Sequence, residues 1–171
     1  MAIREEKRNL ETIPVGSLGM IPLEGCRTLG EKVDYYLVKW RTERESEHKD
    51  SLAFAGYQRD TYILDTKVPR FGSGEAKGMI KESVRGDDLF IMVDVCNYSI
   101  TYTLCGHVNR MSPDDHYQNL KRIISAVGGK ARRITVIMPF LYESRQHKRT
   151  SRESLDCAIA LQELVKMGVD N

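Results

Sequence analysis

Two short apolar runs stand out in the second half of the chain. Residues 89–95 (LFIMVDV) and 133–138 (RITVIM) are nearly continuous in apolar positions, and the second run is rich in β-branched residues. Runs of this length are typical of strands that are covered on both faces. We therefore predict two adjacent, central strands at Leu89 to Val95 and at Arg133 to Met138.

A helical pattern begins after the first of these runs. Ser112, Pro113 and Asp115 have the order of an N-cap, a proline at the first helical position and an acid in the first turn. Gly128 interrupts the apolar spacing that follows. The sequence thus predicts a helix that starts at Pro113 and stops at Gly128.

A second helix is predicted after the run at 133–138. Thr150 and Glu153 have capping-box spacing, which places its start near Thr150 or Arg152, and Gly168 closes it. The order strand, helix, strand, helix indicates an α/β fold with a three-layer, mostly parallel sheet and helices on both faces. Residues 169–171 have the pattern of a turn into a further strand, so we expect the sheet to be truncated at the C-terminus.

The first half of the chain is less distinct. A helix is predicted from Thr28 to about Glu47, and shorter strands are predicted at 61–64 and 79–84. The glycine-rich segment at 71–78 (FGSGEAKG) lies between these strands. We interpret the charged residues 41–50 as a solvated helix end and loop.

Composition narrows the class of protein. A chain of 171 residues with 41% hydrophobic residues and a net charge of +2 fits a single globular domain and gives no general affinity for nucleic acid. We find no signal peptide and no apolar stretch near the roughly 18 residues that span a bilayer. We therefore expect a cytoplasmic protein that binds neither nucleic acid nor membranes.

The four cysteines match neither a disulfide framework nor a zinc pattern. We expect reduced thiols at Cys26, Cys96, Cys105 and Cys157. Cys96, Cys105 and His107 are the one combination that could converge on a metal, but buried cysteines acting as small apolar residues are more common.

Positive charge gathers between the second predicted strand and its helix. In open parallel sheets ligands bind beyond the carboxyl ends of the strands, and a helix N-terminus favours anions. A polyphosphate site is one interpretation, and a solvated loop neutralised by Glu143 and Glu153 is the other. The cations are Arg145, Lys148, Arg149 and Arg152, with His147 among them.

Two further segments are candidates for binding. Ser83 and Arg85, at the turn before residue 89, can share a phosphate or can simply shape that turn. Phe71 can stack on a planar base while Glu75 accepts from its amino group, or Phe71 can be a core residue. The chain has no phosphate-binding GxxxxGK[ST] loop, no GxGxxG and no nucleophilic triad pattern.

Taken in order, these segments resemble the ribose-phosphate pyrophosphokinases, also called phosphoribosyl pyrophosphate synthetases. RFGSGE at 70–75 is similar to the family's RFxDGE, and ESVRGDDLFIM at 82–92 to its ESxRGxDxxII. ITVIMPFLYESRQHKRTSRE at 134–153 is similar to INxVIPYxxYARQDRK followed by SRE. The resemblance covers residues 70–171, whereas residues 1–60 form a divergent N-terminal part.

The resemblance implies a phosphoribosyltransferase-like fold and the amino-terminal, ATP-binding domain of a two-domain oligomeric enzyme. Such enzymes transfer a diphosphoryl group from ATP, with Mg²⁺, to ribose 5-phosphate. By this resemblance ATP contacts Phe71, Glu75, Arg145 and Gln146, and the loop of Phe71 and Glu75 reaches a neighbouring subunit. Lys148, Arg149 and Arg152 are candidate phosphate contacts, and Ser83 with Arg85 matches a regulatory phosphate site.

No catalytic residue and no metal ligand of the family falls within this chain, so we expect the ribose 5-phosphate site and the activity to require a second domain. Ser73 and His147 replace family acids, and the loop at 96–111 is longer than usual. These departures indicate a divergent branch. They also leave open an inactive regulatory or binding homologue of the same fold.

Overall fold

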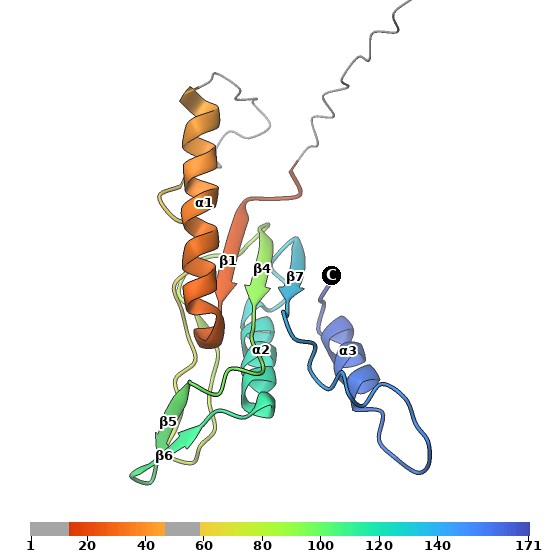
Figure 1. Ribbon diagram of the computed structural model, residues 1–171. Coiled ribbons are helices and arrows are strands. Elements are labelled where there is room, and N and C mark those ends of the chain that lie inside the picture. Colours follow the sequence, from red (N-terminus) through yellow and green to blue (C-terminus); the bar gives the residue numbers. More distant parts are fainter. Residues whose placement is uncertain (1–13, 47–58) are drawn as a thin grey trace, which may run out of the picture.

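The computed structural model of the protein describes residues 14–46 and 59–171. A parallel sheet lies at its centre, in the order β1 (Leu18–Pro22), β4 (Asp88–Met92) and β7 (Arg133–Ile137). Helices α1 (Arg27–Ser46), α2 (Pro113–Val127) and α3 (Asp156–Lys166) pack beside the sheet (Figure 1). Strands β4 and β7 pair in parallel along their whole length. The predicted α/β fold and the pairing of these two strands are confirmed.

The hydrophobic core lies on one face of this sheet. Ile21, Leu89 and Ile91 are fully buried and alternate with residues of the other face, as the two-residue period of a strand requires. They form one cluster with residues of α2 and α3, namely Leu120, Ile123, Ile124, Val127, Ala160 and Leu164. Pro22 points to the opposite face, where a Cβ on Gly30 of α1 would lie 2.4 Å from the Pro22 Cβ. Helices therefore cover both faces.

Helix α1 begins one residue before its predicted start at Thr28 and buries little of its apolar side. Its predicted end near Glu47 lies just outside the described residues. Gly30 is its one buried residue in the described structure, while Tyr36 and Trp40 are 49% and 56% exposed. A helix of this length spans about 30 Å, against about 17 Å for β1. As a result α1 extends past the sheet (Figure 1), and the spacing that predicted the helix does not mark a buried face along its whole length.

The outer strands are shorter than predicted. Strand β3 (Met79–Ile80) pairs with β2 (Thr66–Lys67), so only the start of the segment 79–84 is a strand. In the segment 61–64, Ile63 forms a single parallel bridge with Met20. A short 3-10 helix, η1 (Glu24–Cys26), connects β1 to α1.

A β-hairpin that the sequence did not predict occupies the long loop at 96–111. It pairs β5 (Thr101–Leu104) with β6 (His107–Arg110), and Cys105 and Gly106 between them have φ values of 50° and 79°. Two central turn residues with positive φ match the right-handed twist of the flanking strands. The Cys-Gly pair was the available signal, and it is weaker than Asn-Gly or Asp-Gly.

Helix α3 begins at Asp156, so the predicted start near Thr150 or Arg152 is wrong. The Thr150 hydroxyl does donate to the Glu153 carboxylate over 3.1 Å, but the two residues close a turn within the preceding loop. A capping box specifies a local hydrogen-bond pair, and a loop can satisfy that pair without propagating a helix.

Strand β7 is one of the two edge strands of the described sheet, so the prediction that it is central is wrong. Its outer edge is nevertheless paired over a short distance. Asp170 N donates to Ile134 O over 2.9 Å, and Val136 N donates to Asn171 O over 2.8 Å. The last residues thus follow the outer edge of β7, in agreement with the predicted turn toward a further strand.

Gly78 provides a test of this packing. A Cβ at this position would lie 2.5 Å from Arg122 O of α2, whereas a Cβ on Gly72 would meet nothing within 4 Å. We expect Gly78→Ala to lower the free energy of unfolding by about 1–3 kcal/mol, because the backbones must separate. Gly72→Ala should change it by less than about 1 kcal/mol. Urea unfolding of both variants measures the difference, and equal stabilities would contradict the close contact.

Candidate functional site

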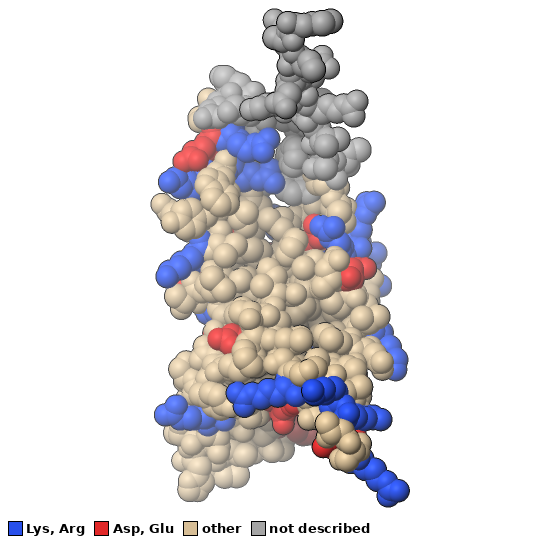
Figure 2. Space-filling view, turned by 45° about the vertical axis from the view of Figure 1, so that its right-hand side comes forward, with Lys and Arg blue, Asp and Glu red and all other residues tan. Residues whose placement is uncertain are grey.

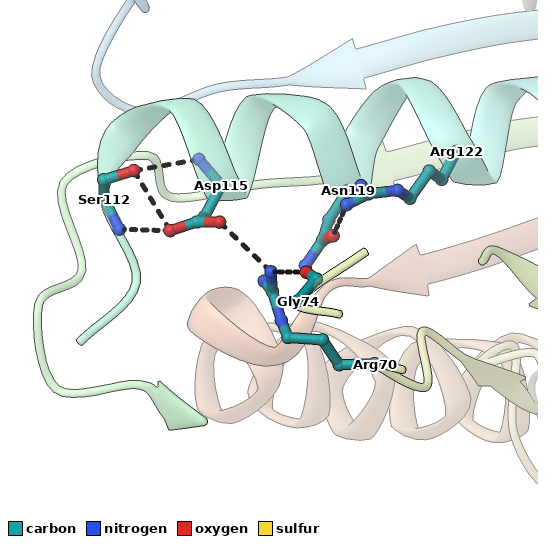
Figure 3. Close-up of polar contacts among 6 residues, drawn as sticks. All are labelled: Arg70, Gly74, Ser112, Asp115, Asn119 and Arg122. Atoms are coloured by element: carbon teal, nitrogen blue, oxygen red, sulfur yellow. Dashed lines mark hydrogen bonds and ion pairs between the residues drawn. The ribbon is translucent and has the colours of Figure 1, made fainter. Parts of the chain in front are cut away.

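The first turn of α2 is the anchor of the candidate site. Ser112 Oγ accepts from Asp115 N over 3.1 Å, and Asp115 Oδ2 accepts from Ser112 N over 3.0 Å, which completes a capping box (Figure 3). The second carboxylate oxygen of Asp115 faces away from this pair. It is therefore available to a residue from another element.

Arg70 occupies that second oxygen. Its Nη1 donates to Asp115 Oδ1 over 3.2 Å and to Gly74 O over 2.7 Å (Figure 3). The guanidinium also lies 3.8 Å from the centre of the Tyr102 ring in β5, and the side chain is only 14% exposed. Arg70 thus ties the glycine-rich loop both to α2 and to the hairpin that the sequence did not predict.

The glycine-rich loop presents its two predicted ligand-binding residues to solvent. Phe71 is 50% exposed, so the interpretation of Phe71 as a core residue is wrong. The Phe71 N–H donates to Glu75 O over 2.6 Å, and the Ser73 hydroxyl donates to the Glu75 carboxylate over 2.9 Å. The loop is a closed turn whose aromatic side chain can be reached by a ligand.

A second loop, which follows β7, is held by the neighbouring acid of α2. The Tyr142 hydroxyl donates to Asp114 Oδ1 over 2.7 Å, and its ring stacks on Tyr117 with centroids 4.2 Å apart. Burial raises the pKa of Tyr142, and the hydrogen bond to Asp114 raises it further. The phenol therefore stays protonated and can continue to donate. Asp114 and Asp115 thus hold the two loops that carry the predicted ATP contacts.

Arg145 lines a cavity of about 290 Å³ beyond the carboxyl ends of β4 and β7. This is the edge of a parallel sheet where ligands usually bind. Besides Arg145, the lining includes one acid, Glu143. The other lining residues are Val95, Cys96 and Tyr98 after β4, Pro113 of α2, and Phe140 and Ser144 after β7. Arg145 has no ion-pair partner in the described parts of the chain.

Gln146 closes the base of the basic loop. Its side-chain Nε2 donates to Ser154 O over 2.8 Å, and its carbonyl oxygen accepts from Cys157 N in α3 over 3.3 Å. His147 is exposed, and its Nδ1 lies 2.9 Å from Ser144 O. The side-chain NH2 group and the backbone carbonyl of Gln146 thus form hydrogen bonds within the protein. Its side-chain oxygen remains for a ligand.

The remaining cations of this loop are exposed and unneutralised. Lys148, Arg149 and Arg152 form no ion pair with any residue that the structure describes. Glu153 instead accepts from the Thr150 and Ser151 hydroxyls, so the expected neutralisation by Glu143 and Glu153 does not take the form of ion pairs. In the view of Figure 2, Lys and Arg side chains dominate the lower part of the molecular surface, with few acids among them.

Ser83 and Arg85 lie at the opposite end of the sheet. They precede β4, whereas Arg145 follows the parallel strand β7, so the two predicted anion sites are not brought together. Ser83 Oγ accepts from Arg85 N over 3.4 Å. Burial raises the pKa of the neighbouring Asp87, whose Oδ2 has no hydrogen-bond partner in the described structure, and this favours a neutral carboxyl beside the two residues.

The described residues do not form a metal site. Residues 14–46 and 59–171 contain no group of three or more His, Cys, Asp or Glu side chains positioned to hold an ion. The four cysteines are free thiols, and Cys96 and Cys105 are exposed, so the expectation that these two are buried is wrong. Burial raises the pKa of the Cys26 thiol to about 11. No helix in the described part of the chain is both long and apolar enough to cross a membrane.

Several anchoring residues of the site were not identified from the sequence. Arg70 and Asp115 lie within motifs that were recognised, but their pairing joins residues 45 positions apart. Asp114 and Tyr142 were not singled out in the sequence, because their pairing joins residues 28 positions apart. The charged and aromatic residue types were visible in the sequence, but which of these residues form hydrogen bonds with one another depends on the fold.

The fold and the site define the class of protein as a parallel α/β domain with a loop rich in cations beyond the carboxyl edge of its sheet. The profile of the N-terminal domain of ribose phosphate pyrophosphokinase matches residues 18–168, and the chain belongs to this family. The match includes residues before Arg70, where the sequence had offered no motif.

Individual relatives agree with this assignment. Ribose-phosphate pyrophosphokinase 1 of Schizosaccharomyces pombe is 33% identical over 63% of this chain and 23% of its own length. Ribose-phosphate pyrophosphokinase of Prochlorococcus marinus is 27% identical over 86% of this chain and 41% of its own length. The chain thus spans less than half of these curated relatives.

A solved structure shows the same fold. The crystal structure of phosphoribosylpyrophosphate synthetase from Mycobacterium smegmatis superposes with a TM-score of 0.61 over 90% of this chain and 40% of that chain, at 20% identity. At this identity the likeness establishes the architecture. The chemistry is argued from the residues themselves.

Asp115 gives a pH-dependent test of the anchor. Burial raises its pKa, but hydrogen bonds from Ser112 and the charge of Arg70 outweigh burial, so the pKa lies below its usual value. A lowered folded-state pKa contributes stability above the unfolded-state pKa of about 3.9, and that contribution is lost as the pH falls through the folded-state value.

We therefore expect Asp115→Asn to lower the free energy of unfolding by about 1–2 kcal/mol at pH 7 and by progressively less below pH ~4. Urea unfolding at several pH values measures this difference. Glu24→Gln, which changes an exposed acid with no side-chain partner in the described structure, should stay within about 0.5 kcal/mol of the native chain. A difference for Asp115→Asn that does not vary with pH would contradict the charge-assisted anchor.

Proposed function

We propose that this protein is the amino-terminal, ATP-binding domain of a two-domain ribose-phosphate diphosphokinase. Such an enzyme transfers a diphosphoryl group from ATP to the anomeric hydroxyl of ribose 5-phosphate. The observation that carries the proposal is the family match over residues 18–168. A second domain would supply the ribose 5-phosphate site and the catalytic groups.

The geometry supports a nucleotide at the cavity of Arg145. Arg145 would form charge-assisted hydrogen bonds to phosphate oxygens, and the side-chain oxygen of Gln146 would accept from an N–H or O–H group of the nucleotide. Lys148, Arg149 and Arg152 would neutralise charge on the phosphates from the loop that Gln146 closes. Catalysis of this kind consists mainly of positioning and of neutralising charge on the transferred group.

Phe71 and Glu75 would contact the adenine. An exposed phenyl ring and a carboxylate suit a planar base with an exocyclic amino group. In an oligomer this loop would serve a neighbouring subunit, and Ser83 with Arg85 would form a regulatory phosphate site. Mg²⁺ would arrive with the ATP phosphates, because the described residues hold no ligand cluster of their own.

The alkylation rate of Cys96 provides a direct test of whether a nucleotide occupies the cavity of Arg145. It is an exposed free thiol in the cavity wall, whereas Cys105 is an exposed free thiol at the tip of the β5–β6 hairpin. We expect saturating Mg²⁺-ATP to slow alkylation of Cys96 by about tenfold or more, because a bound nucleotide covers the sulfur. Alkylation of Cys105, measured by mass spectrometry in the same sample, should stay within about twofold. Unchanged reactivity of Cys96 at saturating nucleotide would exclude binding in this cavity.

Arg145 is the residue on which turnover should depend. In the whole enzyme, Arg145→Ala should lower pyrophosphokinase activity by about a hundredfold or more, because a partly desolvated phosphate contact is worth roughly 2–4 kcal/mol in the transition state. The melting temperature of the Arg145→Ala variant should equal that of the native enzyme, since an exposed loop arginine contributes little to stability.

Two neighbouring variants serve as comparisons for Arg145→Ala. Lys148→Ala should lose less activity, because the adjacent cations substitute for it, and His147→Asp should be tolerated. Normal kinetics of Arg145→Ala would mean that this cation does not contact the nucleotide. A loss of activity that accompanied unfolding would assign it a structural part instead.

A further inference from the structure

A second groove lies along the other half of α2, away from the candidate nucleotide cavity. It has a volume of about 680 Å³ and runs between α2, the segment before β3 and the C-terminal half of α3. Gly78 forms part of its floor, and its Cα approaches the α2 backbone so closely that an added Cβ would lie 2.6 Å from Arg122 C. The groove is thus fixed by backbone packing.

Four cations from three separate segments line this groove. Lys121 and Arg122 come from α2, Lys166 from the last turn of α3, and Lys77 from the segment next to the glycine-rich loop. Glu163 is the one acid in the described lining. The local charge is therefore positive, although the whole chain carries only +2.

The single acid is already engaged. Glu163 Oε2 accepts from Lys121 Nζ over 3.0 Å and lies 3.4 Å from the Tyr117 hydroxyl. Lys166 has no ion-pair partner in the described residues. Arg122 Nη1 donates to Asn119 Oδ1 over 2.7 Å, which orients its guanidinium (Figure 3). Its other N–H groups have no hydrogen-bond partner among the residues that the structure describes.

The surroundings of Arg122 disfavour its positive charge, so a bound anion would stabilise it. Burial lowers the pKa of Arg122, and the nearby charge of Arg70 lowers it further, while Asp115 and Glu75 compensate only in part. A half-buried cation beside other cations is stabilised when an anion enters. The planar guanidinium is suited to two parallel hydrogen bonds with phosphate oxygens.

We propose that this groove binds the phosphoryl groups of a small anionic ligand. Arg122 and Lys166 would bind the phosphoryl oxygens from opposite walls, and the Gln118 and Ser125 side chains would provide neutral donors. A ligand with two phosphoryl groups fits better than one with a single group, because the cations come from both helices. This site is independent of the proposed function and lies apart from Arg145 and from Ser83 and Arg85.

Lys77 connects the groove to the glycine-rich loop. Its backbone N–H donates to Pro69 O over 3.1 Å, and its Nζ lies 5.9 Å from the centre of the Phe71 ring. An anion that attracts the Lys77 ammonium group draws it from the face of that ring. Occupancy of the groove would thus alter the surroundings of Phe71.

The test is to titrate the 171-residue chain with diphosphate and, separately, with inorganic phosphate. Isothermal titration calorimetry measures the affinity, and backbone amide NMR locates the site. We expect diphosphate to bind about tenfold or more tightly than phosphate and to shift the amide signals of residues 77–78, 121–126 and 163–167. Arg122→Gln and Lys166→Gln should each weaken diphosphate binding by about fivefold to tenfold, which corresponds to roughly 1–1.4 kcal/mol. Neither change creates a buried charge, and circular dichroism verifies the fold.

Two control variants make the outcome specific. Lys32→Gln removes an exposed charge from α1, far along the chain from the groove, and should change binding by less than about twofold. Arg145→Ala should leave the shifts at residues 121–126 intact. Shifts confined to residues 143–157, or equal weakening by Lys32→Gln, would overturn the proposal. The wild-type NMR map alone decides between the two sites if a variant does not fold.

Discussion

The reciprocal hydrogen bonds between Ser112 and Asp115 are the interaction on which the rest of the site depends. They fix the first turn of α2 and leave one oxygen of Asp115 for Arg70 and the carboxylate of Asp114 for Tyr142. A helix N-terminus is a natural place for such anchors, because its free N–H groups and dipole stabilise carboxylates. Two loops from different parts of the chain are thereby brought to one helix turn, and the hydrophobic face of α2 in turn fixes that turn on the sheet.

The elements that could be predicted from the sequence are those specified by local chemistry. Strand β4 is an apolar run buried on the sheet, and β7 is a β-branched run that buries Ile134. Helix α2 has its cap, its proline and its terminating Gly128 within one segment. The start of α3 could not be placed in this way, because the Thr150 and Glu153 pair forms the same hydrogen bonds in a loop. The β5–β6 hairpin was missed because the alternation of β5 (TYTL) lasts for only four residues and β6 (HVNR) does not continue it.

The candidate site was partly visible for the same physical reason. Arg145 and its neighbouring cations could be located from charge, since the basic loop directly follows a strand. The contacts of Arg70 with Asp115 and Tyr102 could not, because they depend on how segments far apart in the chain pack. Spacing also gave no indication of the groove beside Arg122, whose cations come from three segments. Residue type indicates the chemistry, and packing selects the partners.

The position of β4 between β1 and β7 means that the sheet is closed by two chain segments of different length. Strand β4, the β5–β6 hairpin, helix α2 and strand β7 follow one another along the chain, and β4, α2 and β7 share the buried cluster around Leu89 and Leu120. Residues 93–132 connect β4 to β7. Strand β1 reaches β4 only across residues 23–87, and closing that longer segment carries a larger entropic penalty with little local compensation. The β4–α2–β7 unit, which carries the anchor of the site, thus closes at the smaller entropic penalty, and we expect it to form before β1 and α1 dock.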